Sequence, residues 1–252
     1  MSEFRLPNVR KMFIPDSGKV IVDVDLAGAD AQVVAWEADD SELKAAFRAG
    51  ISVHLKNGAD MFGERFTLAP GHHKDPGTEK GRMYDALKRS VHLTNYLGTP
   101  RGMSLNPNIR WPLHECEAFQ RRWFALHPGV RDWHKRIERG IYTSRSVRNR
   151  FGYRIIYFDR IDAVLPQAVA WGPQSTVAEV CFRGALQLRN LPWVEILMQV
   201  HDSIVFQMPI RRHTAGDLET IKRHLEVPVP YEDPLLISWG MAVSEKSWGD
   251  CK

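Results

Sequence analysis

Residues 196–208 read ILMQVHDSIVFQM. The apolar stretches on both sides of His201 and Asp202 predict a β-hairpin that carries this pair at its tip. An imidazole and a carboxylate inside an apolar segment destabilise the fold unless they are bound or used, because polar groups removed from water need partners. Asp202 is therefore the first candidate functional residue.

The composition is that of a globular protein with one large domain or two smaller ones. The 252 residues are 44% hydrophobic and 25% charged. The sequence has neither an apolar run of about 18 residues nor the apolar core of a secretory signal, so a cytoplasmic location is expected. Three scattered cysteines argue against a disulfide framework and against structural zinc. The net charge of +4 suits a polyanionic partner without requiring one.

Strand and helix patterns follow one another without regular alternation, which predicts an α+β fold. Strands are expected at 20–24 and 235–248, and hairpins at 146–159 and 196–208. Helical patterns occupy 29–36, 52–64, 82–98, 114–144, 165–188 and 211–225, and the segments 69–81 and 99–112 are expected to be loops.

A second group of acids ends the first strand. In VIVDVDL (20–26), alternation places Ile21, Asp23 and Asp25 on one face. Asp25 and Asp202 on adjacent strands would repel each other unless a cation lay between them, and Mg²⁺ is the natural choice because it takes oxygen ligands. Alternatively, Asp25 caps the next helix and Asp202 only forms a turn. These residues by themselves leave both interpretations open.

The helix expected at 82–98 presents Lys88, His92 and Tyr96 at intervals of four residues. At 3.6 residues per turn the three side chains share one face. A cation and two rings in a row can hold a triphosphate at one end and stack a base or sugar along the helix. A solvated helix face is the alternative.

Several segments, taken in order, resemble family A DNA polymerases of the bacterial DNA polymerase I type. VDLAGADAQVVAW (24–36) resembles the first metal motif, RMYDALKRSVHLTNYLG (82–98) the fingers helix, and QVHDSIVFQ (199–207) the hairpin with the second metal aspartate. PGVRDWHKRI, RFGYRIIY, AWGPQSTVAEV and GMAVSEKSW match further family segments, so the resemblance covers essentially the whole chain.

The resemblance implies a polymerase palm, an antiparallel sheet with helices, and a mainly helical fingers subdomain. The expected boundaries are 1–50 for palm with the first metal motif, 51–125 for fingers, and 126–252 for palm with the second metal motif and tail. No counterpart of the thumb or the exonuclease domain is recognised, so a separate subunit is expected to supply them, in a bacterial or phage-infected cell. The implied partners are primer-template DNA and dNTPs.

The resemblance also implies residue roles. Asp25, Asp202 and the Leu26 carbonyl would hold two Mg²⁺ ions for nucleotidyl transfer to a primer 3′-hydroxyl. On the nucleotide, Lys88 would bind the phosphates and protonate the leaving pyrophosphate, His92 would stack on the nucleotide, and Asp30 would lie against the sugar 2′ carbon. Arg82 or Lys80 would bind the γ-phosphate, and Tyr96 would lie beside the template base. On the DNA, Gln174 and His201 would contact the minor-groove edge, and Arg154 would bind a backbone phosphate.

This chain departs from the family pattern at several positions. Ser203 stands where an acid usually follows the second metal aspartate, and Asp23 lies on the right face to replace it. The other departures are Asp30 for a longer glutamate, His92 for Phe or Tyr, Tyr84 for an arginine, and Ala170 for an asparagine.

Two rival functions remain. A catalytically degenerate palm would act as a DNA-binding or replisome-interaction module, favoured by Ser203, Tyr84 and Ala170. A metal-dependent nuclease would use the same carboxylates but leave the face of the 82–98 helix without a purpose. His72 and His73 together with His54 are not interpreted as a metal site, because the Pro- and Gly-rich surroundings suit a mobile loop.

Overall fold

The computed structural model describes residues 7–251, which form two compact units. Unit 1 comprises Met1–Ala29 and Ser175–Lys252, and unit 2 comprises Asp30–Gln174. Among the described residues no helix is long and apolar enough to cross a bilayer.

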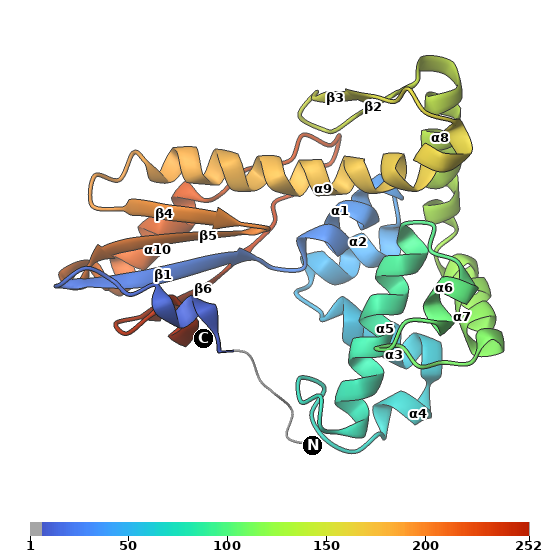
Figure 1. Cartoon of the computed structure of the whole chain (residues 1–252), viewed down its shortest axis with the longest axis horizontal. Coiled ribbons are helices and arrows are strands. Elements are labelled where there is room, and N and C mark those ends of the chain that lie inside the picture. Colours follow the sequence, from blue (N-terminus) through green and yellow to red (C-terminus); the bar gives the residue numbers. More distant parts are fainter. Residues whose placement is uncertain (1–6, 252) are drawn as a thin grey trace. The chain divides into compact units, whose positions relative to one another are not determined.

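Unit 1 is built on a four-stranded sheet in the order β4-β5-β1-β6, with every neighbouring pair antiparallel (Figure 1). Its strands are β1 (Lys19–Leu26), β4 (Glu195–Val200), β5 (Ser203–Pro209) and β6 (Trp239–Ser244). The unit also contains α10 (Ala215–His224), the later part of α9 (Ile161–Leu188), and the short 3-10 helices η1 (Val9–Met12), η2 (Ile210–Arg212) and η3 (Trp248–Asp250). The predicted antiparallel sheet and the 196–208 hairpin are thus confirmed.

Alternate residues of the strands are buried on opposite faces of this sheet, as the sequence pattern predicts. Val22 of β1 and Phe206 of β5 are fully buried on the face that packs against α9 and α10. Ile21 and Val205 point to the opposite face, where Trp248 of η3 covers them. Alternation therefore places the odd-numbered acids of β1 on the η3 side of the sheet.

Unit 2 is mainly helical, with one small hairpin. Its helices are α1 (Ala29–Glu37, whose first residue belongs to unit 1), α2 (Ser41–Arg48), α3 (Val53–Phe62), α4 (Glu64–Thr67), α5 (Glu79–Asn95), α6 (Pro100–Ser104), α7 (Leu113–Leu126), α8 (Pro128–Ser144) and the part of α9 up to Gln174. The hairpin consists of β2 (Ser146–Arg148) and β3 (Arg154–Ile156), as the 146–159 pattern predicts.

Several expected boundaries differ from the structure; α5, for example, begins at Glu79, within a segment expected to be a loop. The segment 99–112 is not entirely a loop, because Thr99 caps α6 by accepting a hydrogen bond from the Gly102 amide (3.0 Å) and Pro100 suits a first helical turn. The helix expected at 165–188 begins earlier, at Ile161, and runs through both Pro166 and Pro173 without a break.

A buried hydrogen-bonded pair in unit 2 links the N-terminus of α2 to the α7–α8 junction. Asp40 caps α2 by accepting a hydrogen bond from the Leu43 amide (2.9 Å), and its other oxygen lies 2.6 Å from Nδ1 of His127, at the α7–α8 junction. Burial works to raise the pKa of Asp40, but the hydrogen bonds from His127 and Leu43 outweigh it and lower that pKa. Asp40 is therefore ionised and anchored in the folded protein.

Candidate active site

The sheet of unit 1 brings the two predicted metal-binding segments together. Asp25 faces Ser203 across the β1–β5 ladder, one residue from Asp202. The Leu26 amide donates a hydrogen bond to the Asp202 carbonyl oxygen at 3.0 Å. The β4–β5 hairpin has a two-residue loop, His201–Asp202, in which His201 takes the left-handed conformation with φ of 55°. Backbone hydrogen bonds thus fix both aspartates at the same end of the sheet.

The buried thiol of Cys181 on α9 reports on the field of these acids. Burial raises the pKa of Cys181 to about 12, and the charges of Asp202 and Asp25 add to the shift. Both carboxylates therefore act on the same point of unit 1.

The donor set fits Mg²⁺ better than a metal held by protein alone. The described residues contain no group of three or more His, Cys, Asp or Glu side chains that could hold a metal. Two carboxylates, Asp25 exposed and Asp202 half-buried, leave positions for waters and substrate phosphates. Mg²⁺ is typically bound in this way.

Asp23 and Ser203 are engaged by other groups. The Trp248 indole N–H donates a hydrogen bond to Oδ2 of Asp23 at 2.7 Å, and Oδ1 is buried without a hydrogen-bond partner among the described residues. The Ser203 hydroxyl donates to the Val200 carbonyl oxygen at 3.1 Å. Asp23 lies on the predicted face, but its carboxylate accepts a hydrogen bond from Trp248 of η3.

In unit 2, α5 presents the predicted row of side chains. Thr78 caps the helix by accepting a hydrogen bond from the Gly81 amide, and Lys88 and His92 follow along the helix, with Tyr96 as the C-cap. The rings of His92 and Tyr96 lie 4.8 Å apart, edge to face. The Tyr96 hydroxyl donates a hydrogen bond to Oδ1 of Asp30, and Nδ1 of His92 lies 3.2 Å from Oδ2. Asp30 is thus held by both rings.

The sequence interpretation missed His54 as a member of this region. Burial lowers the pKa of His54 to about 4, with a further contribution from the positive charge of Lys88. Its Nδ1 is buried and has no hydrogen-bond partner in the described part of the chain. The ring of Tyr84 lies 6.0 Å from His54 and 5.1 Å from His73. The spacing of Tyr84 and Lys88, one helical turn apart, is the only sequence signal for this arrangement.

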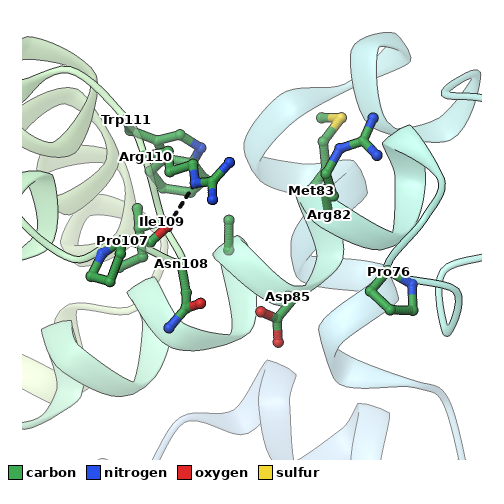
Figure 2. Close-up of a pocket in the computed structure, with 10 residues that line it drawn as sticks. Pro76, Arg82, Met83, Asp85, Pro107, Asn108, Ile109, Arg110 and Trp111 are labelled. Carbon is green, nitrogen blue, oxygen red and sulfur yellow. Dashed lines mark hydrogen bonds between the residues drawn. The ribbon is translucent and has the colours of Figure 1, made fainter. Parts of the chain in front are cut away.

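Arg82 does not share the Lys88 face, and both Arg82 and Lys80 are bonded to backbone carbonyl groups. The Arg82 guanidinium donates to the Gly77 carbonyl oxygen at 2.8 Å, and Lys80 donates to the Thr67 carbonyl oxygen at 3.0 Å. Figure 2 shows Arg82 across from Arg110 at a cavity of about 530 Å³. Six residues separate Arg82 from Lys88, which places them about 120° apart around the helix.

The three predicted DNA contacts lie in different elements. Arg154 is exposed on β3, Gln174 is exposed on α9, and His201 is exposed in the β4–β5 loop. Arg154 and Gln174 belong to unit 2 and His201 to unit 1. The local structure leaves all three side chains accessible from solvent.

Comparisons with known proteins identify the family. The family model described as DNA polymerase family A matches residues 2–250. A thermostable DNA polymerase I of Thermus filiformis is 28% identical over 97% of this chain and 29% of its own length. DNA polymerase I of Helicobacter pylori strain J99 is 26% identical over 97% of this chain and 26% of its own length. The chain therefore spans less than a third of the length of these relatives.

A solved structure shares the fold. The polymerase (POL) domain of Pol1 from M. smegmatis, in complex with a DNA primer-template and a dNTP, matches with a TM-score of 0.76. The match covers 96% of this chain and 42% of that chain at 16% sequence identity. Together with the predicted motifs that unit 1 brings to one end of its sheet, these matches establish that the chain belongs to DNA polymerase family A.

Proposed function

We propose that this chain carries out template-directed DNA synthesis and adds dNTPs to a primer 3′-hydroxyl. The observation that carries the proposal is the pairing of β1 with β5, which sets Asp25 one residue from Asp202 at the end of the sheet. Membership of DNA polymerase family A supports the reaction class. The proposal concerns the activity of this chain, which spans only part of its relatives.

The carboxylates of Asp25 and Asp202, with the Leu26 carbonyl, would hold two Mg²⁺ ions. Bound there, the ions would lower the pKa of the primer hydroxyl and stabilise the charge on the transferred phosphoryl group. The protein's own contribution is positional: the β1–β5 ladder and the Leu26–Asp202 hydrogen bond hold the two carboxylates before any ligand arrives. A preformed site of this kind avoids the entropy cost of ordering loops on binding.

The α5 face would bind the incoming nucleotide. Lys88, exposed and close enough to the half-buried His54 to influence its pKa, would attract the triphosphate and protonate the leaving pyrophosphate. His92 would stack on the nucleotide, and Tyr96 would lie beside the template base. Asp30, held by both rings, would crowd the sugar 2′ carbon and favour deoxyribose.

Three exposed residues would contact DNA. Arg154 would meet a backbone phosphate, and Gln174 and His201 would contact the minor-groove edge of the primer terminus. Because the phosphate backbone dominates affinity for DNA, a palm and fingers without further contacts would bind duplex weakly. A separate chain with thumb and exonuclease functions would add phosphate contacts and strengthen binding.

A degenerate palm that only binds DNA is the second candidate. One local observation favours it. Ser203 is not an acid and its hydroxyl donates to the hairpin backbone, and the Asp23 carboxylate accepts a hydrogen bond from Trp248, so neither residue gives Asp25 and Asp202 a third free carboxylate. Under this alternative the chain would bind primer-template without extending it.

A single-nucleotide incorporation matrix separates the two functions. Four primer-templates that differ in the first template base are each incubated with one dNTP at a time in the presence of Mg²⁺. Template-directed synthesis gives one-base extension only for the four complementary combinations. Binding of the primer-template without extension, both for the chain alone and after addition of a thumb-containing fragment of a related polymerase, would support the degenerate palm instead.

A further inference from the structure

The β2–β3 hairpin of unit 2 has one covered face and one open face. Val147 and Tyr157 are buried against α8 and α9, in a cluster that includes Ile141 and Val164. The ladder continues past β3, because the Tyr157 amide donates to the Arg145 carbonyl oxygen at 2.8 Å. Side chains alternate along an extended strand, so those of residues 154, 156 and 158 point outward. We call these residues together with Arg148 the outer hairpin face.

Two arginines oppose each other on this face. Arg148 and Arg154 are direct partners in the β2–β3 register, and both are exposed. Neighbouring arginines have acidic partners: Arg150 pairs with Glu37 at 2.7 Å, and Arg160 with Asp162 at 3.0 Å. Within residues 7–251, neither Arg148 nor Arg154 forms an ion pair, and Arg148 donates only to the Gly152 carbonyl oxygen at 3.1 Å.

Like charges directly opposite each other destabilise an antiparallel ladder. The hairpin therefore holds two positive charges side by side without acidic partners. Their repulsion destabilises the ladder, and a bound polyanion would relieve it. This charge arrangement selects the occupant: successive phosphates of a nucleic acid strand can neutralise both guanidiniums at once.

Phe158 extends the same face with an aromatic ring. Its side chain is 88% exposed, the highest value among the large hydrophobic residues of the described chain, and Ile156 between it and Arg154 is 44% exposed. An isolated exposed apolar residue needs no explanation. A ring in line with two unpaired arginines is the combination by which proteins bind single-stranded nucleic acid, with bases stacked on aromatics and phosphates on cations.

We propose that the outer hairpin face binds single-stranded DNA, with Arg148 and Arg154 on the phosphates and Phe158 stacked on an unpaired base. The ligand is single-stranded because bases in a duplex already stack on one another and offer no free face to the ring. The inference deepens the proposed DNA contact of Arg154 and rests on DNA being the substrate. It adds base stacking at Phe158, which a phosphate contact does not require.

The test measures binding by fluorescence anisotropy with the full chain, without Mg²⁺ or dNTPs, so that no synthesis takes place. The probes are a labelled oligothymidylate and an abasic oligonucleotide of the same length. The variants are Phe158→Ala, Phe158→Trp and the double variant Arg148→Ala/Arg154→Ala. Leu68→Ala serves as the matched control, because Leu68 is 76% exposed elsewhere in unit 2.

Phe158→Ala should weaken oligothymidylate binding by roughly 5- to 100-fold, as expected for the loss of one stacked base. The abasic probe should be unaffected by this change, Phe158→Trp should restore binding, and Leu68→Ala should match the wild type. The double arginine variant should weaken both probes and flatten the dependence of log K on log salt by about 0.7 for each phosphate that the variant no longer neutralises.

Unchanged oligothymidylate affinity in Phe158→Ala would overturn the inference, as would equal losses on both probes or no binding by the wild type. Because the assay involves no synthesis, its result is separate from the proposed activity. If the wild type extends primers but Phe158→Ala does not change binding, only this inference is overturned. Phe158-dependent binding without any primer extension sinks only the proposed polymerase activity.

Discussion

The backbone amide of Leu26 donates a hydrogen bond to the carbonyl oxygen of Asp202 at 3.0 Å. This contact extends the β1–β5 ladder beyond the strand and into the hairpin loop. The separation of the two carboxylates is therefore set by a hydrogen-bonded sheet and not by flexible segments.

The first prediction concerns the coupling of metal binding to stability. Asp25→Asn removes one of two converging negative charges, so without Mg²⁺ it should leave the free energy of unfolding equal to or higher than that of the wild type. Excess Mg²⁺ should stabilise the wild type, because a ligand that binds only the folded state shifts the equilibrium. It should not stabilise the variant. Urea unfolding with and without Mg²⁺ measures both effects, and equal stabilisation of the two proteins would argue against a shared site.

His201 gives a second prediction, in which stability and function move in opposite directions. Its φ of 55° lies in the left-handed region, which glycine adopts without strain. His201→Gly should raise the free energy of unfolding by about 0.5–1 kcal/mol. If the imidazole contacts the primer terminus, the same variant should bind primer-template more weakly. Thermal unfolding and fluorescence anisotropy measure the two effects. A His201→Gly variant that is less stable than the wild type would show that the backbone at His201 is not strained.

A third prediction follows from the buried pair of Asp40 and His127. The pKa of Asp40 is lowered in the folded state, so its contribution to stability is present above the unfolded-state pKa and is lost as pH falls through the folded-state value. Asp40→Asn keeps a capping side chain but removes the charge. At pH 7 the variant should lose about 3 kcal/mol, the typical cost of breaking a buried pair.

The pH dependence of the same variant provides its control. The wild type should lose stability steeply in acid, below about pH 4, whereas the acid limb of Asp40→Asn should be flatter. Parallel curves for the two proteins, measured by urea unfolding between neutral and acidic pH, would mean that Asp40 does not titrate as proposed.

The fourth prediction concerns sugar selectivity. Tyr96 holds Asp30 through its hydroxyl, and His92 lies 3.2 Å from the other carboxylate oxygen. Tyr96→Phe removes one of these contacts and lets Asp30 move, so we expect the preference for dNTPs over rNTPs to fall by roughly 10-fold, the equivalent of one lost hydrogen bond. Asp30→Ala should lower it further, because the group that crowds the 2′ carbon is then absent. Single-turnover incorporation of matched dNTP and rNTP measures the ratio, and an unchanged ratio in Asp30→Ala would contradict the assigned role.

Residue patterns predicted the elements that depend on local periodicity. Alternation in VIVDVDL placed Asp23 and Asp25 on the face opposite Val22, and the four-residue spacing on α5 aligned Lys88 with His92. The family motifs that predicted the carboxylate pair lie within the segment that the family model matches. These features follow from short stretches of sequence.

Long-range contacts were not predictable in this way. Nothing in the sequence near Asp23 indicates that Trp248, 225 residues later, donates a hydrogen bond to it. The position of half-buried His54 near Lys88 depends on the packing of α3 against α5, which the helical pattern at 52–64 does not indicate. Arg82 or Lys80 was predicted to reach the γ-phosphate, and the sequence did not indicate that the Arg82 guanidinium donates a hydrogen bond to the Gly77 carbonyl oxygen.

The most direct test of the central claim is primer extension by two matched carboxylate variants. Asp202→Asn removes a proposed metal ligand, whereas Glu219→Gln makes the same chemical change at an exposed position of α10. With Mg²⁺, primer-template and four dNTPs, and with the partner fragment present if the chain requires it, the wild type and Glu219→Gln should extend at equal rates. Asp202→Asn should lose at least about 1000-fold in rate, the order expected when transition-state charge stabilisation by a catalytic group is removed. Extension by Asp202→Asn at the wild-type rate would contradict the proposal that Asp25 and Asp202 bind the Mg²⁺ ions required for DNA synthesis.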